Sequence, residues 1–143
     1  MRVLFDTNVV LDVLLERHPF SETAAAILSR VEKGEVVGFL CATTITTIYY
    51  LVSKTLNRNK ADECIRKLLN LFEIAAVNRP VLETARDLNF KDFEDAIIYA
   101  SALHSGCNCV VTRNIKDFSR TEIPVFSPEE FLKILEIKNE LDE

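Results

Sequence analysis

The sequence lacks an excess of positive charge. Its 143 residues include 17 lysines and arginines against 22 aspartates and glutamates, and the formal net charge is −5. Proteins that hold nucleic acid without regard to sequence rely on bulk positive charge to contact phosphates. The composition argues against that class, but it allows an enzyme whose site gathers carboxylates and neutralises them with a metal ion.

Long apolar runs are also lacking, because no stretch approaches the length of a membrane-spanning helix. The N-terminus shows no secretory signal pattern, since Met1 is followed almost at once by an apparent core strand. We therefore expect a cytoplasmic protein. The four cysteines fit reduced, mostly buried thiols in that compartment.

Apolar residues are plentiful: they make up 48% of the chain, and nine of them are phenylalanine. This content indicates a globular chain rather than a disordered one. A length of 143 residues fits one domain with a hydrophobic core. Because we find no internal repeat, low-complexity segment or linker, we predict a single domain over residues 1–143.

Short apolar runs alternate with helical patterns along the chain. This alternation predicts an α/β fold: a single three-layer α/β/α domain around a mostly parallel sheet of about five strands. Pro124 places the last strand at an edge of the sheet. The predicted strands are the opening run to Phe5 and residues 36–41, 73–77, 109–112 and 123–126. The predicted helices cover residues 9–16, 20–33, 43–57, 59–72, 80–88 and 94–104, with a last one from residue 127.

Several helix starts carry residues that typically cap helices. Thr43 or Thr44 is expected to cap the third helix, and Asn59 the fourth. Pro80 suits the first position of the fifth helix. In Ser127-Pro128-Glu129-Glu130, the serine and the last glutamate predict a capping box.

Polar stretches cluster where the predicted strands end. Ligands of open α/β sheets bind beyond the carboxyl ends of the strands. Asp92 and Asp95 lie three residues apart and so share a helix face. Carboxylates brought together repel one another unless a cation offsets them, and Mg²⁺ prefers oxygen ligands. A hard divalent ion at this edge would support phosphoryl chemistry. The stretches are Asp6-Thr7-Asn8 and residues 44–47, 92–95 and 112–117.

Three of these stretches resemble motifs of the PIN-domain family. Leu4-Phe5-Asp6-Thr7-Asn8 is similar to the start of a PIN domain, and residues 92–96 and 110–118 resemble the later motifs in order and spacing. The resemblance covers essentially the whole chain. It implies a Mg²⁺- or Mn²⁺-dependent ribonuclease that cleaves RNA, of the kind that forms the toxin of VapBC toxin–antitoxin pairs. It also implies a cognate antitoxin as a partner, and a homodimer.

The resemblance also assigns roles to individual residues. Asp6, Asp95 and Asp117 would be metal ligands, and Asp92 a further catalytic acid. The residues expected to line the site are Asn8, Thr47, Thr112 and Asn114, and those expected to contact the RNA backbone are Arg113 and Lys116.

The chain departs from the family pattern in two places. Many PIN nucleases have a glutamate near the position of Thr47, and Asn114 stands where many have aspartate. With fewer charges, weaker metal binding, altered activity and a catalytically silent binding module all stay open. A third alternative is an aspartyl-phosphate phosphatase, because Asp6-Thr7-Asn8 resembles the Asp-x-Asp opening of haloacid-dehalogenase-like enzymes apart from the final Asn8.

Each candidate also has a purely structural interpretation. Asp6 and Asp92 precede helices, where they would act as caps. Asn114 and Asp117 would be turn-formers. Capping and turns explain each stretch alone, but they explain less readily why all the stretches occur in this order, which favours a shared site.

Overall fold

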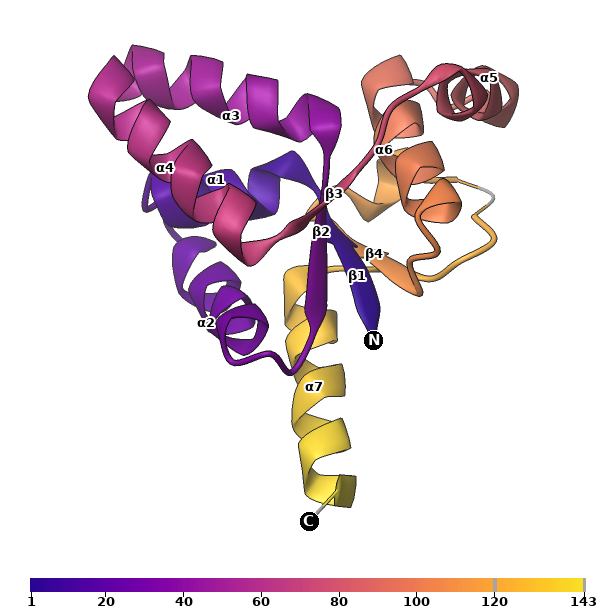
Figure 1. The fold of residues 1–143 in the computed structure, drawn as a ribbon. Coiled ribbons are helices and arrows are strands. Elements are labelled where there is room, and N and C mark those ends of the chain that lie inside the picture. The colour runs from indigo at the N-terminus through magenta and orange to yellow at the C-terminus, as the bar shows by residue number, and fades with distance from the viewer. Residues whose placement is uncertain (120, 143) are drawn as a thin grey trace.

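A computed structural model describes residues 1–119 and 121–142. Its strands form one sheet with the order β3-β2-β1-β4-β5, and each neighbouring pair runs parallel (Figure 1). The predicted α/β/α fold with about five strands is confirmed, and the sheet is parallel throughout rather than mostly so. The strands are β1 (Arg2–Phe5), β2 (Val37–Cys41), β3 (Glu73–Ala75), β4 (Cys109–Val111) and β5 (Val125–Phe126).

Helices cover both faces of this sheet (Figure 1). One face packs against α1 (Thr7–Leu14), α2 (Ser21–Glu32), α3 (Ala42–Thr55), α4 (Arg58–Leu71) and α7 (Pro128–Asp142). The other face packs against α5 (Arg79–Leu88) and α6 (Phe93–His104), and a short 3₁₀ helix, η1 (Ile115–Asp117), follows β4. Among the described residues, no helix is both long enough and apolar enough to cross a membrane.

The central strand β1 explains where the site lies. Val3, Leu4 and Phe5 are fully buried, and β1 pairs with β2 on one side and β4 on the other. Phe5 packs edge-on against Phe72 and Phe131 in one layer, whereas Leu4 belongs to the core on the opposite face. This double burial fixes the strand, so the residue after it is held at the middle of the sheet edge.

Two predicted helix caps are wrong. Helix α3 starts at Ala42 without a side-chain cap, so neither Thr43 nor Thr44 precedes it. Helix α4 is capped by Asn57 rather than Asn59: the Asn57 side chain accepts a hydrogen bond from the Lys60 amide at 2.8 Å. Two asparagines two residues apart have the same capping propensity, and the extended backbone at the first one decides between them.

Other predicted ends agree with the structure within two or three residues. Ser127 and Glu130 form the predicted capping box, with reciprocal hydrogen bonds of 3.1 and 2.9 Å. Strand β5 lies at the sheet edge, as Pro124 indicated. Pro80 is the second residue of α5 rather than the first, because Arg79 already belongs to the helix. All four cysteines are free thiols.

Candidate active site

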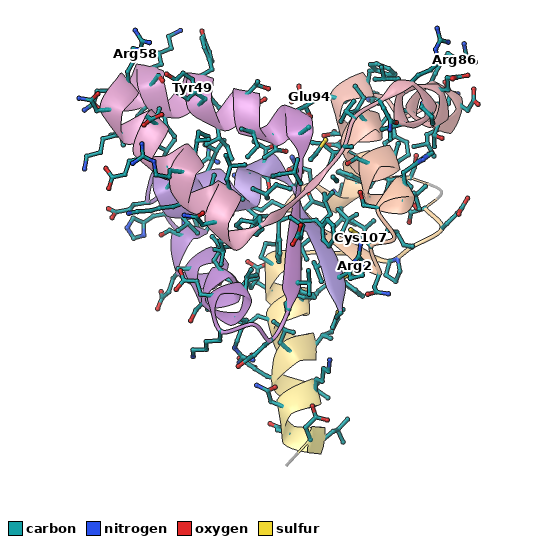
Figure 2. All side chains as sticks on the ribbon, viewed as in Figure 1. Arg2, Tyr49, Arg58, Arg86, Glu94 and Cys107 are labelled. Carbon is teal, nitrogen blue, oxygen red and sulfur yellow. The ribbon has the colours of Figure 1, made fainter. Side chains whose placement is uncertain are left out.

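The residues that follow β1 and β4, together with α1, the middle of α3 and the start of α6, line one pocket. Seven of the predicted site residues line it. These are Asp6, Asn8, Thr47, Asp92, Asp95, Arg113 and Asn114. Figure 2 labels one further lining residue, Glu94, at the start of α6. The convergence follows from parallel topology, because neighbouring strands of such a sheet end at the same edge.

Asp6 is held rigidly at the centre of this edge. It is only 4% exposed. Its Oδ1 accepts a hydrogen bond from the Thr7 amide at 2.7 Å, and its Oδ2 accepts one from the Thr112 hydroxyl at 2.7 Å. Burial raises the pKa of Asp6, and these two hydrogen bonds oppose that rise. Asp6 therefore caps α1, as its structural interpretation proposed, and also presents a fixed carboxylate to the pocket.

Asp95 is the most perturbed acid of the pocket. Burial raises its pKa to about 7, and the negative charges of Asp6, Asp92, Asp117 and Glu94 add to the rise. Four acids from three segments of the chain thus act on one half-buried carboxyl group. Perturbation by burial together with specific charges is typical of functional sites.

Asn8 supplies an unusual acceptor beside these acids. Its Nδ2 lies 3.4 Å from the Asp6 carboxylate, while its Oδ1 is buried and has no hydrogen-bond partner among the described residues. Buried polar atoms rarely stay unpaired. An amide oxygen in this state, next to carboxylates, has the chemistry that a hard cation prefers.

These residues fit a sparsely ligated divalent ion. As placed, residues 1–119 and 121–142 contain no group of three or more His, Cys, Asp or Glu side chains that could hold a metal. Mg²⁺, however, keeps several waters and needs only one or two carboxylates beside a substrate phosphate. Asp6 and Asp95, with the Asn8 amide oxygen, provide such an all-oxygen set.

The remaining predicted residues lie around this centre rather than in it. Thr112 is fully buried behind Asp6, to which it donates its hydroxyl hydrogen bond. Asp117 and Lys116 are exposed and line a neighbouring hollow with Arg113 and Asn114. Asp117 nevertheless acts on Asp95 through its charge.

Asp92 and Thr47 have local hydrogen bonds of their own. The Asp92 carboxylate accepts bonds from the Glu94 and Asp95 amides at 2.8 and 3.4 Å, so it caps α6 while lining the pocket. The Thr47 hydroxyl donates to the Thr43 carbonyl at 3.1 Å. Thr47, where the family resemblance led us to expect a glutamate, thus adds no charge to this pocket.

Sequence reasoning missed three residues at the site: Glu94, Asp12 and Arg17. Glu94 lines the pocket, and it lies within the predicted acidic motif, so its type and place were visible signals. Asp12 is the one charged residue of α1 and is fully buried, a visible anomaly in an apolar helix. Arg17 carries no comparable signal, because a lone arginine after a helix is ordinary.

Arg113, predicted to contact RNA, lies at the pocket with its guanidinium bound to Asp12. Its positive charge lowers the pKa of Asp6, which shows that the cation acts on the acidic centre. It is therefore a fixed charge beside the carboxylates rather than a freely moving surface side chain.

Comparisons with known proteins agree with this arrangement. Residues 2–116 match the PIN domain family model. The chain is 34% identical over 138 residues to Ribonuclease VapC1 of Aquifex aeolicus (strain VF5), covering 91% of this chain and 92% of that protein.

Solved structures share the fold over a similar span. A toxin–antitoxin complex from Klebsiella pneumoniae is 26% identical with a TM-score of 0.68, covering 88% of this chain and 97% of that chain. VapBC2 from Rickettsia felis, bound to a DNA fragment from their promoter, has a TM-score of 0.70 at 18% identity, covering 89% and 98%. The family match assigns Asp6-Thr7-Asn8 to the opening of a PIN domain rather than to a phosphatase motif. This chain belongs to the PIN-domain family.

Proposed function

We propose that this protein is a ribonuclease that hydrolyses RNA phosphodiester bonds with Mg²⁺ or Mn²⁺ as its cofactor. The observation that carries the proposal is the set of acids around Asp95: burial and four negative charges raise the pKa of this carboxyl group to about 7. A divalent ion would relieve this repulsion and satisfy the Asn8 amide oxygen. The name of the 34% identical relative, Ribonuclease VapC1, supports the same activity.

The side chains divide the work by position. Asp6, Asp95 and Asn8 would hold the ion, and the hydrogen bonds from Thr7 and Thr112 keep the Asp6 carboxylate in one orientation. When bound, the ion would supply a nucleophile at neutral pH and offset charge on the phosphoryl group. Asp92 and Glu94 line the same pocket, and the Asp117 charge reaches it from the adjacent hollow. We assign these acids to orienting water and the substrate.

The decisive test is cleavage of a mixed RNA panel with Mg²⁺, Mn²⁺ or EDTA. Wild-type protein should cut with metal and not with EDTA, and the double variant Asp6→Asn, Asp95→Asn should not cut. Asp62→Asn is a matched control, because Asp62 is an exposed acid of α4 paired with Arg66 at 3.2 Å, away from the pocket. Full activity in the double variant would contradict the proposal.

We also propose that the protein is the toxin of a toxin–antitoxin pair, acting as a homodimer and bound by a cognate antitoxin. Support comes from the 26% identical toxin–antitoxin complex of Klebsiella pneumoniae, which matches 88% of this chain. Expression of the wild-type protein alone should arrest growth of a bacterial host, whereas the Asp6→Asn, Asp95→Asn variant should not. Equal growth with both proteins would count against toxicity.

A second candidate function is a silent module that binds RNA or protein without cutting. Two observations favour it: Thr47 brings no charge to the pocket, and the described residues hold no preformed three-acid metal group. This candidate predicts RNA binding that is equal with and without divalent metal, and no cleavage of any RNA. Metal-dependent turnover would exclude it.

A further inference from the structure

Beside the acids, the same pocket has a second and oppositely charged wall. It is built on Asp12, whose side chain is fully buried and contacts two arginines. Arg17 Nε lies 2.9 Å from Asp12 Oδ1, and Arg113 Nε lies 2.7 Å from Asp12 Oδ2. Arg113 adds a second bond, from Nη2 to Asp12 Oδ1, at 3.2 Å. One buried carboxylate thus fixes two guanidinium groups.

Further contacts hold the two guanidinium groups in place. The Arg113 group stacks 3.9 Å above the centre of the Phe20 ring, which fixes its plane. Arg17 Nη2 donates to the Asn8 carbonyl at 3.3 Å, on the residue that also flanks Asp6. Both arginines stay partly exposed, at 38% for Arg17 and 25% for Arg113, and both line the pocket.

The charges of this wall do not cancel. Two guanidinium groups face one carboxylate, so one positive charge is left over at the pocket. The hydrogen bonds of Arg113 to described residues use Nε and Nη2. A guanidinium has five N–H donors, so donors remain for an incoming anion.

A purely structural pairing explains this arrangement less well. One arginine is enough to neutralise Asp12, and a buried ion pair adds little net stability compared with apolar packing. The second arginine therefore calls for another explanation. Planar, fixed guanidinium groups match the oxygens of a phosphate, and Arg113 and Arg17 stand on the wall of a pocket whose other wall carries the acids.

We propose that Arg113 and Arg17 form a phosphate-binding subsite for the RNA backbone, and that Asp12 is the positioning residue that holds them beside the carboxylates. This inference rests on the proposed ribonuclease function. The acids and their ion would engage the phosphate to be cut, while the arginines bind backbone oxygens and set the strand's position along the pocket. Asp12 itself does not touch the RNA.

The first test measures binding of a fluorescein-labelled, mixed-sequence single-stranded RNA in EDTA by anisotropy, over a series of salt concentrations. Each phosphate contact contributes about 0.7 to the slope of log affinity against log salt for a single strand. Arg113→Gln and Arg17→Gln should each reduce that slope by about 0.7. Arg30→Gln is the matched control and should leave the slope unchanged. Arg30 lies near the C-terminal end of α2, pairs with Glu35 at 2.9 Å and does not line the pocket.

The second test separates positioning from charge. Asp12→Asn keeps both arginines, so the salt slope should not fall, but kcat for RNA cleavage should drop about ten- to hundredfold because the groups are no longer fixed. Arg113→Lys keeps the charge and loses the two-bond geometry, so it should also keep the slope and lower kcat. If Asp12→Asn does not fold, Arg113→Lys carries this test, with Arg30→Lys as its control.

The outcomes separate this proposal from the ribonuclease proposal. Suppose that the wild-type protein cuts no RNA, but that Arg113→Gln and Arg17→Gln reduce the slope of log affinity against log salt. The phosphate subsite then stands and the ribonuclease proposal fails. If the wild type cuts RNA and both glutamine variants keep its slope, the subsite is overturned. RNA binding by the wild type that is undetectable or independent of salt also overturns it.

Discussion

The two walls of the pocket handle charge in opposite ways. On one wall, Asp95 is surrounded by four other acids and burial raises its pKa to about 7. On the other wall, Asp12 is buried more completely, but two arginines contact its carboxylate within 3 Å. The folded chain thus supplies cations to one buried acid and withholds them from the other. The carboxylate of Asp12 is thus paired within the protein itself. Under the proposed function, Asp95 would gain its cation only from a bound divalent ion.

The largest effect is expected when an acid is removed from the wall that carries Asp95. Asp95→Asn should lower metal-dependent RNA cleavage by about a thousandfold, because it removes both a metal ligand and charge that acts on the transferring group. Steady-state cleavage with saturating Mn²⁺ measures the effect. Activity within tenfold of wild type would show that Asp95 has only a structural role at the start of α6. The control variant Asp62→Asn should lose no activity.

The two walls should respond oppositely in stability. Asp12→Ala should lower the free energy of unfolding by about 1–3 kcal/mol, because two partly buried guanidinium groups lose their partner. Asp95→Asn should leave stability at neutral pH equal or higher, since it removes a carboxylate whose charged form is disfavoured by the fold. Urea denaturation of both variants gives the comparison. Equal destabilisation by both would contradict the distinction between the two walls.

Removing the hydrogen bond from Thr112 that orients the Asp6 carboxylate should have a smaller effect, which is seen in metal affinity. Thr112→Val removes the 2.7 Å hydrogen bond to Asp6 Oδ2 and keeps the size of the side chain. Partners that orient a metal ligand contribute about tenfold or more to metal affinity. Mn²⁺ affinity should therefore fall about tenfold in Thr112→Val and recover in Thr112→Ser, which restores a hydroxyl. Equal Mn²⁺ affinities for Thr112→Val and Thr112→Ser would contradict the role of the Thr112 hydroxyl in orienting Asp6.

The smallest expected effect is a pH dependence of stability. Asp95 binds a proton in the fold up to a pKa of about 7, while the unfolded chain releases it near the ordinary value of 3.8. The native state therefore holds the extra proton between these values, and the stability from this group falls as pH rises through that window. Because Asp95 is half exposed, solvent screens the effect.

The Asp95→Asn variant lacks this titrating group. The quantity to measure is therefore the difference in free energy of unfolding between the wild type and this variant. The free energy of unfolding of the wild type should fall relative to that of the variant between about pH 4 and about pH 7. Added Mg²⁺ should reverse the fall at the upper end, because a ligand that binds only the folded state stabilises it. A difference that is flat across the window would contradict the shifted pKa.

Much of the fold and of the acidic wall could be predicted from the sequence. Val3, Leu4 and Phe5 form an uninterrupted apolar run followed by an acid, a pattern that predicts Asp6 at the carboxyl end of a buried strand. The structure adds that this strand is the central one. Parallel topology then brings Asp95 and the residues after β4 to the same edge. Helix ends were predicted where one residue type stood alone, as at Ser127, and mispredicted where two equivalent residues competed, as at Asn57 and Asn59.

The arginine wall could not be predicted in the same way. Its central contact joins Asp12 and Arg113, which are 101 residues apart, and no periodicity links them. The position of Thr112 behind Asp6 likewise depends on the pairing of β1 with β4, across 106 residues. Local patterns predict which residues reach the sheet edge, but pairings between distant side chains follow only from the packed structure.

The central claim is that the acidic wall is completed by a divalent ion, and Mn²⁺ titration by calorimetry tests it most directly. Wild type and Asp62→Asn should bind one Mn²⁺ with equal affinity, while Asp6→Asn and Asp95→Asn should each bind it much more weakly. Equal binding by all four proteins, or no binding by the wild type, would contradict the claim.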